Sequence, residues 1–254
     1  MASAKSTKGV LLVTGANRGI GKAIAILGAQ AGYSVAVHYG QHREEADTVC
    51  HAIYGLGQKS VAVCADMADE DAIINLFKTV DHALGPVNAL VNNAGGIIAI
   101  CEIAEISAEI VQRALMVNLA GPILCCREAV RRMSTRRGGK GGAIVNISSM
   151  AAVLGGLPHE VHYAASKGGV DSFTIGLARE VATEGVRVNA IRPGVIDTPI
   201  HERHGGADFL DRFKSNLPMQ RPGQPEEIAE AALWLLSPAA SYVTGSILNV
   251  SGGR

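Results

Sequence analysis

The stretch Gly9-Val10-Leu11-Leu12-Val13-Thr14-Gly15-Ala16-Asn17-Arg18-Gly19-Ile20-Gly21 joins an apolar run to a glycine-rich turn. The apolar run is typical of a parallel strand that is buried on both faces. Glycines in the turn let the backbone approach a phosphate closely, and a helix that starts there offers free N–H donors and the positive end of its dipole. The stretch therefore predicts a strand, a nucleotide-binding turn and a helix.

The alternation of strand and helix continues along the chain. Apolar runs predict further strands at residues 34–39, 60–65, 87–91, 143–147, 186–191 and 246–250. Helical patterns predict helices at residues 22–31, 43–54, 69–84, 107–133 (bent at Gly121-Pro122), about 163–183 and 225–236. Such alternation predicts a parallel sheet covered by helices on both faces. We predict an α/β fold, a single doubly wound domain of the Rossmann type over residues 1–254 with about seven strands.

Composition narrows the class of protein. The chain has 254 residues, of which 48% are apolar, and its formal net charge is +0. A neutral chain generates no global field that would attract nucleic acid or an anionic membrane. The first residues contain no apolar signal-peptide core, and no apolar run reaches the roughly 18 residues that span a bilayer. We predict a cytoplasmic protein that binds neither nucleic acid nor membrane.

The chain has five cysteines and no C-x-x-C pair. Cys64 falls in a strand-like run, and Cys125 and Cys126 fall in a helical one. This usage predicts buried free thiols in a reducing compartment and no metal site.

Polar and glycine-rich segments follow several predicted strands directly. They are Thr14–Gly21, Asp66, Asn92–Gly95, Ser148-Ser149 and Arg192–Thr198. Ligands of open α/β sheets bind beyond the carboxyl ends of the strands. These segments are therefore expected to share one cleft.

Tyr163 and Lys167 carry the chemistry that this cleft suggests. Their spacing of four places both side chains on one face of a helix. A nearby ammonium favours the phenolate and lowers the pKa of the phenol, so Tyr163 could exchange a proton with a substrate oxygen. A tyrosine and a lysine four residues apart also occur by chance on ordinary surface helices.

Two segments interrupt the regular pattern. The basic, glycine-rich segment 131–142 fits either a solvated loop after a helix or a docking site for an acidic partner. Residues 195–218 have weak periodicity and are expected to form a substrate lid. The lid contains His201 and His204, which we interpret as surface residues because no carboxylate or cysteine completes a ligand set.

Taken in order, these motifs resemble the classical short-chain dehydrogenase/reductase family over nearly the whole chain. The turn from Thr14 to Gly21 is similar to the family's cofactor fingerprint, and Asn92-Asn93-Ala94-Gly95 to its second signature. Asn118 stands where the family has a helix asparagine. The matches to its catalytic and nicotinamide residues are Ser149, Tyr163, Lys167, Pro193, Gly194 and Thr198.

The resemblance implies hydride transfer between a nicotinamide cofactor and an alcohol or carbonyl. It implies that Tyr163 is the general acid or base, that Lys167 also binds the nicotinamide ribose, and that Ser149 bonds the substrate oxygen. Asn118 would hold a water chain that carries the proton. The residues expected to bind cofactor are Gly15, Asn17, Arg18, Gly19, Ile20, Tyr39, Asp66, Met67, Asn93, Ala94, Gly95, Tyr163, Lys167, Pro193, Gly194, Ile196 and Thr198. A homotetramer is also implied.

The end of the second strand predicts which cofactor is preferred. An NAD site usually has a carboxylate there, for the ribose 2′-hydroxyl. Here Tyr39 occupies that place, and no acid occurs before Glu44. Arg18 and Arg43 are both close in sequence, and guanidinium groups suit a 2′-phosphate. We predict a preference for NADPH, with solvated arginines as the alternative.

One departure from the family concerns the gap between Ser149 and Tyr163, which is one residue longer than usual. The extra residue is expected within residues 154–161, on the substrate side. We expect Ser149 and not Ser148 to face the cleft, because successive strand residues point to opposite faces. His159 and His162 are either substrate contacts or, more simply, exposed residues.

We predict an oxidoreductase that acts on a small alcohol or carbonyl with NADP(H). A non-catalytic NADP-binding regulatory protein and a 3-oxoacyl-(acyl-carrier-protein) reductase are the alternatives. Keto-acyl, sugar and steroid substrates all stay open. The predicted cleft has apolar residues with polar neighbours, so its polarity does not distinguish among these substrates. The apolar residues are Leu154, Leu157, Ile196, Ile200 and Phe209.

Overall fold

The computed structural model describes residues 8–200 and 205–254. Its centre is a seven-stranded sheet in the order β3-β2-β1-β4-β5-β6-β7, and every neighbouring pair is parallel. The strands are β1 Val10–Val13, β2 Ser34–Tyr39, β3 Ser60–Cys64, β4 Val87–Asn92, β5 Gly142–Ile147, β6 Val186–Pro193 and β7 Ile247–Val250. The predicted doubly wound parallel sheet is confirmed.

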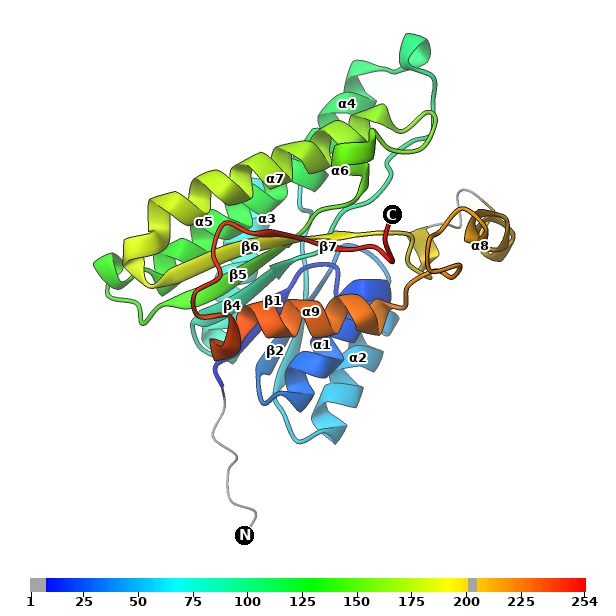
Figure 1. Cartoon of the computed structure of the whole chain (residues 1–254). Coiled ribbons are helices and arrows are strands. Elements are labelled where there is room, and N and C mark those ends of the chain that lie inside the picture. The colour runs from blue at the N-terminus through cyan, green and yellow to red at the C-terminus, as the bar shows by residue number, and fades with distance from the viewer. Residues whose placement is uncertain (1–7, 201–204) are drawn as a thin grey trace.

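Helices cover both faces of this sheet (Figure 1). They are α1 Gly19–Gln30, α2 Arg43–Gly55, α3 Glu70–Ala83, α4 Ala108–Leu115, α5 Gly121–Met133, α6 Ala151–Leu154, α7 Val161–Val181, α8 Ala207–Lys214 and α9 Pro225–Leu236. Helices α1, α2 and α9 share one hydrophobic cluster with the sheet. Helices α3, α5 and α7 share the other. The sheet is therefore the middle of three layers.

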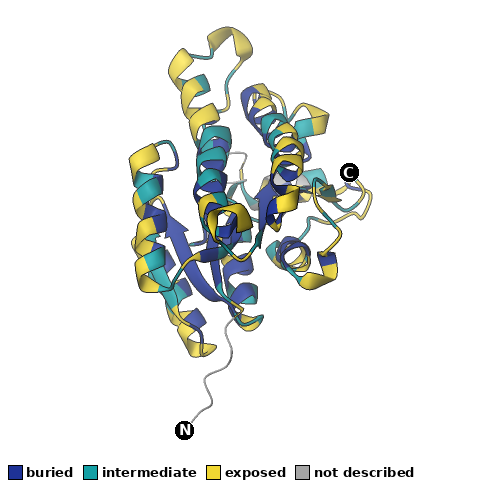
Figure 2. Ribbon diagram, turned by 90° about the vertical axis from the view of Figure 1, so that its left-hand side faces the viewer, coloured by how far each residue is buried: buried dark blue, intermediate teal, exposed yellow. Residues whose placement is uncertain are grey.

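Strand β1 shows why residues Val10–Val13 are all apolar. Leu11 and Val13 belong to the cluster under α1, α2 and α9. Val10 and Leu12 belong to the cluster on the opposite face. Because successive side chains point to opposite faces and both faces are covered, the strand has no solvent side. Figure 2 shows the sheet as a continuous buried layer between helices whose outer faces are exposed.

The long helical segment is interrupted earlier than the sequence predicted. A π-helical turn, Met116–Ala120, separates α4 from α5. Pro122 lies in the first turn of α5, so the π-helical irregularity falls directly before the bend expected at Gly121-Pro122. The short helix α6 and helix α8 were not predicted. Helix α8 falls inside the segment that was expected to be an irregular lid.

By length and composition, one helix could cross a membrane. The segment Ala108–Met133 contains an 18-residue window of mean hydropathy 1.2, and 33% of that window is buried. Polar residues such as Asn118 interrupt this window, so the expectation that no continuous apolar run reaches about 18 residues still holds for this helix. Its α5 part lies in the cluster against the sheet, where a core helix passes the same test.

Two further expectations can be compared with the structure. Cys125 and Cys126 are buried free thiols, but Cys64 is exposed at the end of the edge strand β3. In the basic segment 131–142, Arg131 pairs with Glu128, Arg132 with Glu128 and Asp81, and Arg136 with Glu184. This segment leads into the amino end of β5, at the sheet edge opposite to the carboxyl ends.

Candidate functional site

A cleft of about 860 Å³ lies at the carboxyl ends of the strands. Most of the residues predicted for the site line it together. They are Gly15, Asn17, Arg18, Gly19, Ile20, Asp66, Met67, Asn93, Ala94, Gly95, Ser149, Tyr163, Lys167, Pro193, Gly194, Ile196 and Thr198. Segments from five strand ends therefore meet in one site, as their order along the chain predicted.

The glycine-rich turn after β1 has the geometry of a phosphate cradle. Gly15 and Gly19 have φ of 63° and 54°, a region in which a side chain is strained. A Cβ on Gly21 would lie 2.1 Å from the carbonyl oxygen of Gly15, so only glycine fits there. Helix α1 has neither a side-chain cap nor an acidic residue in its first turn. Its free N–H groups are thus available to an anion, and the turn fits a dinucleotide pyrophosphate.

Buried hydrogen bonds hold this turn against the end of β4. The hydroxyl of Thr14 accepts from the backbone N–H groups of Asn93 and Ala94, both at 2.9 Å. The amide of Asn93 donates to the carbonyl oxygens of Thr14 and Gly15, at 2.9 and 3.0 Å. The two predicted signatures therefore form one unit that fixes the backbone beside the cleft.

His38 supports the same turn from below, and sequence reasoning did not identify it. Its Nδ1 accepts from the N–H of Gly15 at 2.9 Å, while Nε2 lies 3.0 Å from the carbonyl oxygen of Ala65 and donates to it. Burial lowers the pKa of His38 to about 4, so the ring is neutral at pH 7. The strand pattern gave no signal for this role, since both partners lie far from His38 in sequence.

Asp66 is engaged by a residue that the sequence did not single out. Both of its carboxylate oxygens accept from the guanidinium of Arg113 on α4, at 2.9 and 3.0 Å. The pKa of Asp66 is lowered, mainly by these hydrogen bonds. Arg113 lines the cleft as well. Asp66, one of the residues expected to bind cofactor, is therefore held in place by an ion pair across the cleft wall.

Two of the residues considered for the cofactor lie off the cleft wall. The Tyr39 side chain is buried in the core cluster beside α1 and α2. Arg43 is exposed and pairs with Asp47 at 3.4 Å. Gln41 and His42 line the cleft in their place, and His42 has a left-handed φ of 62°.

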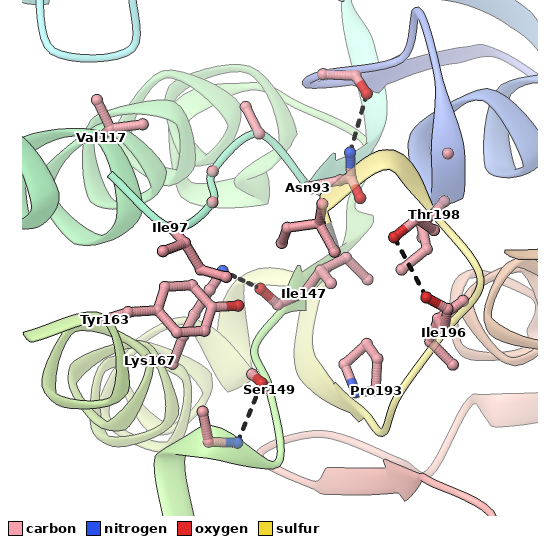
Figure 3. A pocket seen from close by; sticks show the side chains of 18 of the residues that line it. Asn93, Ile97, Val117, Ile147, Ser149, Tyr163, Lys167, Pro193, Ile196 and Thr198 are labelled. Carbon is pink, nitrogen blue, oxygen red and sulfur yellow. Dashed lines mark hydrogen bonds between the residues drawn. The ribbon is translucent and has the colours of Figure 1, made fainter. Parts of the chain in front are cut away.

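Tyr163, Lys167 and Ser149 face one part of the cleft (Figure 3). The ammonium of Lys167 donates to the carbonyl oxygen of Ile147 at 2.7 Å and lies 5.8 Å from the centre of the Tyr163 ring. The Ser149 hydroxyl accepts from the N–H of Ala151 at 3.1 Å and is hydrogen-bonded to Tyr163. These contacts orient a phenol, a hydroxyl and an ammonium toward the same space.

Burial dominates the titration of this group. It raises the pKa of Tyr163 to about 12, although the hydrogen bond with Ser149 opposes the shift. Glu160 adds to the increase. Burial also lowers the pKa of Lys167 to about 8, against the attraction of Asp171. The expectation that Lys167 lowers the pKa of Tyr163 is wrong for this arrangement, because both groups are more than nine-tenths buried and lose hydration.

The two adjacent serines have different surroundings. The Ser148 hydroxyl is buried and donates to the carbonyl oxygen of Lys167 at 3.3 Å. Ser149 is the serine that reaches Tyr163, as expected, although Ser148 also lines the cleft. In the loop 154–161, His159 has a left-handed φ of 70°, which strains a residue with a side chain.

His162 is not exposed, contrary to the simpler expectation. It is 7% exposed, and neither ring nitrogen has a hydrogen-bond partner among the described residues. It also does not line the cleft, although it precedes Tyr163 directly.

Asn118 lies in the π-helical turn and is fully buried. Its Oδ1 accepts from the N–H of Gly96 at 2.8 Å, and its Nδ2 donates to the carbonyl oxygen of Gly96 at 3.0 Å. The turn thus directs this side chain to the loop after β4. π-Helical turns often occur at functional sites.

His201 and His204 lie outside the described residues. Among residues 8–200 and 205–254, no group of three or more histidine, cysteine, aspartate or glutamate side chains could hold a metal ion.

Comparison with known proteins gives consistent matches along the whole chain. The family model described as Enoyl-(Acyl carrier protein) reductase matches residues 15–254. The uncharacterized oxidoreductase YgfF of Escherichia coli (strain K12) is 49% identical over 245 residues, or 96% of this chain and 99% of that protein. A 3-oxoacyl-[acyl-carrier-protein] reductase of Synechocystis is 40% identical over 248 residues, or 97% of each. The crystal structure of a short-chain type dehydrogenase/reductase from Mycobacterium marinum superimposes with a TM-score of 0.90 at 33% identity, covering 97% of this chain and 95% of that chain.

Proposed function

We propose that this protein reduces a small carbonyl substrate with NADPH in the cytoplasm. The chain belongs to the short-chain dehydrogenase/reductase family and is an oxidoreductase acting on CH–OH groups. The observation that carries the proposal is the group of Tyr163, Lys167 and Ser149 at one point of the cleft, beyond a glycine-rich turn that fits a dinucleotide. The alternative of a non-catalytic binding protein is set aside with the family assignment.

The roles of the chain's own residues follow from their chemistry. The nicotinamide would supply a hydride to the carbonyl carbon. Ser149 donates a hydrogen bond to the carbonyl oxygen as negative charge develops there. Tyr163 gives its phenolic proton to that oxygen, which completes the alcohol and leaves a phenolate. Lys167 stabilises this phenolate, because a group with a pKa of about 8 is mostly protonated at neutral pH.

The pKa of Tyr163 favours reduction over oxidation at neutral pH. A phenol with a pKa of about 12 is protonated at pH 7 and can act as an acid. Oxidation of an alcohol would require the phenolate, which burial disfavours. Asn118 has one amide N–H and one oxygen lone pair beyond its bonds to Gly96, and these can hold a water that reprotonates the site.

Three features support NADPH as the cofactor. Arg18 lines the cleft at the start of α1, and His42 and Gln41 line it after β2. No carboxylate at the end of β2 lines the cleft, in the part of the chain that the structure describes. The nearest acid, Glu45, accepts a hydrogen bond from the side chain of Asn17 at 2.6 Å. We assign recognition of the 2′-phosphate to Arg18, since Arg43 pairs with Asp47 instead.

Residues 195–218 serve as the substrate lid in this proposal. Val195, Leu210 and Leu217 form a small cluster with Phe213, apart from the two large clusters of the core. A small separate cluster opens at lower free energy than a core helix. This property suits a segment that covers a substrate and releases a product.

We assign a homotetrameric assembly, supported by the apolar side chains that α7, α9 and the segment before β7 expose. Tyr242 is fully exposed, and Trp234 and Ile175 are 44% and 36% exposed. Light scattering at micromolar concentration should give about four times the chain mass, and a monomer would reject the assembly.

The direct test is oxidation of NADPH, and separately of NADH, with a panel of aldehydes, ketones and 3-oxoacyl thioesters. At least one carbonyl should be reduced, more efficiently with NADPH. Tyr163→Phe should abolish this turnover while NADPH binding persists, because it removes only the proton donor. Equal turnover by Tyr163→Phe would contradict the assigned chemistry.

A second candidate, a 3-oxoacyl-acyl-carrier-protein reductase, is supported by the similarity to the Synechocystis enzyme. The basic segment 131–142 gives it little support, because Arg131, Arg132 and Arg136 are paired and the segment lies at the sheet edge opposite to the cleft. Turnover of carrier-linked but not free 3-oxoacyl thioesters would favour this candidate.

A further inference from the structure

Arg254 places a cation in the substrate part of the cleft. The basic residues of the cleft wall at the cofactor side are Arg18, His38, His42 and Arg113, and the carboxylates of the wall are Asp66, which pairs with Arg113, and Glu160. Lys167 lies beside Tyr163. Arg254 lines the same cleft from the segment after β7, near helix α8. Figure 1 shows this end of the chain beyond the carboxyl edge of the sheet, on the side of α8.

The backbone around Arg254 is held rather than frayed. The Ser251 hydroxyl donates to the carbonyl oxygen of Arg254 at 3.0 Å. The carbonyl oxygen of Gly252 accepts from the N–H of Met219 at 3.2 Å, which fastens the segment to the chain after α8. Gly252 and Gly253 have φ of 63° and 89°, so this tight turn depends on glycine.

The guanidinium of Arg254 is held in a way that leaves its donors usable. Its Cζ lies 4.7 Å from the centre of the Phe213 ring, the distance of a cation–π contact. Stacking against a ring leaves the N–H groups in the guanidinium plane free to donate to an oxyanion. Among the described residues, no carboxylate forms an ion pair with it. Partial burial lowers the pKa of Arg254.

A partly desolvated guanidinium without a carboxylate is costly unless it binds something. The cleft wall that carries Tyr163 and Arg254 also includes the apolar side chains of Met150, Leu154 and Leu157. This combination of surfaces fits a molecule with a carbonyl, a short apolar part and an anionic group.

We propose that Arg254 is a specificity-determining residue that binds a carboxylate or phosphate group on the carbonyl substrate. The inference rests on the proposed carbonyl reduction and names its substrate class. Guanidinium groups bind both oxyanions through paired N–H donors, so the two share one recognition chemistry. The neutral ester or alcohol of the same skeleton lacks this contact.

The experiment compares matched pairs of substrates with NADPH. The pairs are levulinate with methyl levulinate, dihydroxyacetone phosphate with dihydroxyacetone, and acetoacetyl pantetheine with and without its phosphate. The wild-type enzyme should prefer the charged member of at least one pair in kcat/KM. The first pair reports a carboxylate, the second a free phosphate ester and the third the phosphate of a carrier.

Arg254→Met should lower kcat/KM for the charged member by about 10- to 100-fold and leave the neutral member unchanged, the loss expected for a charged hydrogen bond. Arg254→Lys should restore part of it, and the KM for NADPH should not change. Lys214→Met, which removes an exposed cation from α8, is the matched control and should behave as wild type. Equal losses for both members of every pair, or a wild-type preference for the neutral ones, would overturn the inference.

A binding measurement separates this inference from the proposed function. With NADPH present, levulinate or dihydroxyacetone phosphate should raise the Tm of the wild-type protein but not of Arg254→Met. If no carbonyl is reduced and the anions still raise the Tm through Arg254, carbonyl reduction is wrong and the anion site stands. If neutral carbonyls are reduced and neither anion raises the Tm, the anion site is wrong and the reductase stands.

Discussion

The two halves of the cleft are held together by different forces. In the cofactor half, formed by the ends of β1 to β4 and the start of α1, buried hydrogen bonds connect Thr14, Asn93, His38 and the glycine turn. In the substrate half, formed by residues 148–160, 193–200, 205–218 and Arg254, a small apolar cluster holds the lid. The cofactor half is tied into the core of the sheet, and the lid in the substrate half packs in a separate small cluster.

This difference separates two kinds of mutational effect. Changes in the cofactor half should lower stability and cofactor affinity together, because the same hydrogen bonds serve both. Changes in the substrate half should alter kcat or the choice of substrate with little loss of stability. The predictions that follow test that separation.

After the loss of turnover expected for Tyr163→Phe, the largest effect is expected from Ser149→Ala. Loss of one preorganised donor to a developing oxyanion typically costs roughly 10²–10³ in kcat. The Tm and the KM for NADPH should stay near wild type. Ser148→Ala is the matched control, since its hydroxyl bonds the backbone of Lys167 and not Tyr163. A damaging Ser148→Ala with a nearly silent Ser149→Ala would reverse the assignment of the two serines.

The cofactor half should lose stability in acid through His38. Its pKa is about 4 when folded against 6.5 for an ordinary histidine. Between these values the unfolded chain binds more protons, so stability is present above pH 6.5 and falls as the pH drops toward 4. The free energy of unfolding should fall by about 3 kcal/mol in total, because each unit of pKa difference corresponds to about 1.36 kcal/mol.

Urea unfolding at a series of pH values measures this effect. His38→Gln should be less stable than wild type at pH 7 and should show a flatter profile between pH 6.5 and 4. The matched control, His51→Gln, changes an exposed histidine and should keep the wild-type slope. An unchanged slope in His38→Gln would show that other groups cause the acid loss.

A smaller effect is expected from Arg18→Ala, at the edge of the cofactor half. It should lower kcat/KM with NADPH by about 10-fold, the scale of one charged hydrogen bond, and leave NADH nearly unchanged. The Tm should not move, because the Arg18 side chain makes no hydrogen bond to the described chain. Arg43→Ala is the control on the exposed ion pair. Equal losses with NADPH and NADH would contradict recognition of the 2′-phosphate by Arg18.

The smallest effect concerns His162, which lies beside the substrate half but outside the cleft. Leucine in its place removes a buried ring whose nitrogens have no partner among the described residues, so thermal unfolding should show a gain of about 1 kcal/mol. His51→Leu, at an exposed position, should change stability by less than about 0.5 kcal/mol. A loss of stability in His162→Leu would mean that the ring has a partner across a subunit interface.

Several features could be predicted from the sequence because they depend on local patterns. The apolar run before Gly15 predicted a strand covered on both faces, and its alternation with helices predicted a doubly wound sheet. The rule that parallel strands end at one edge then brought Asp66, Asn93, Ser149 and Pro193 into one cleft. Spacing alone placed Tyr163 and Lys167 on one face of a helix.

Other features depended on the tertiary structure, because burial and distant partners decide them. No local pattern could indicate that His38 bonds Gly15, that Arg113 holds Asp66, or that Arg254 lines the cleft from the segment after β7. The direction of the Tyr163 pKa shift also depended on burial. The sequence correctly placed an ammonium one turn away, but the desolvation that outweighs it comes from the whole fold packed around both groups.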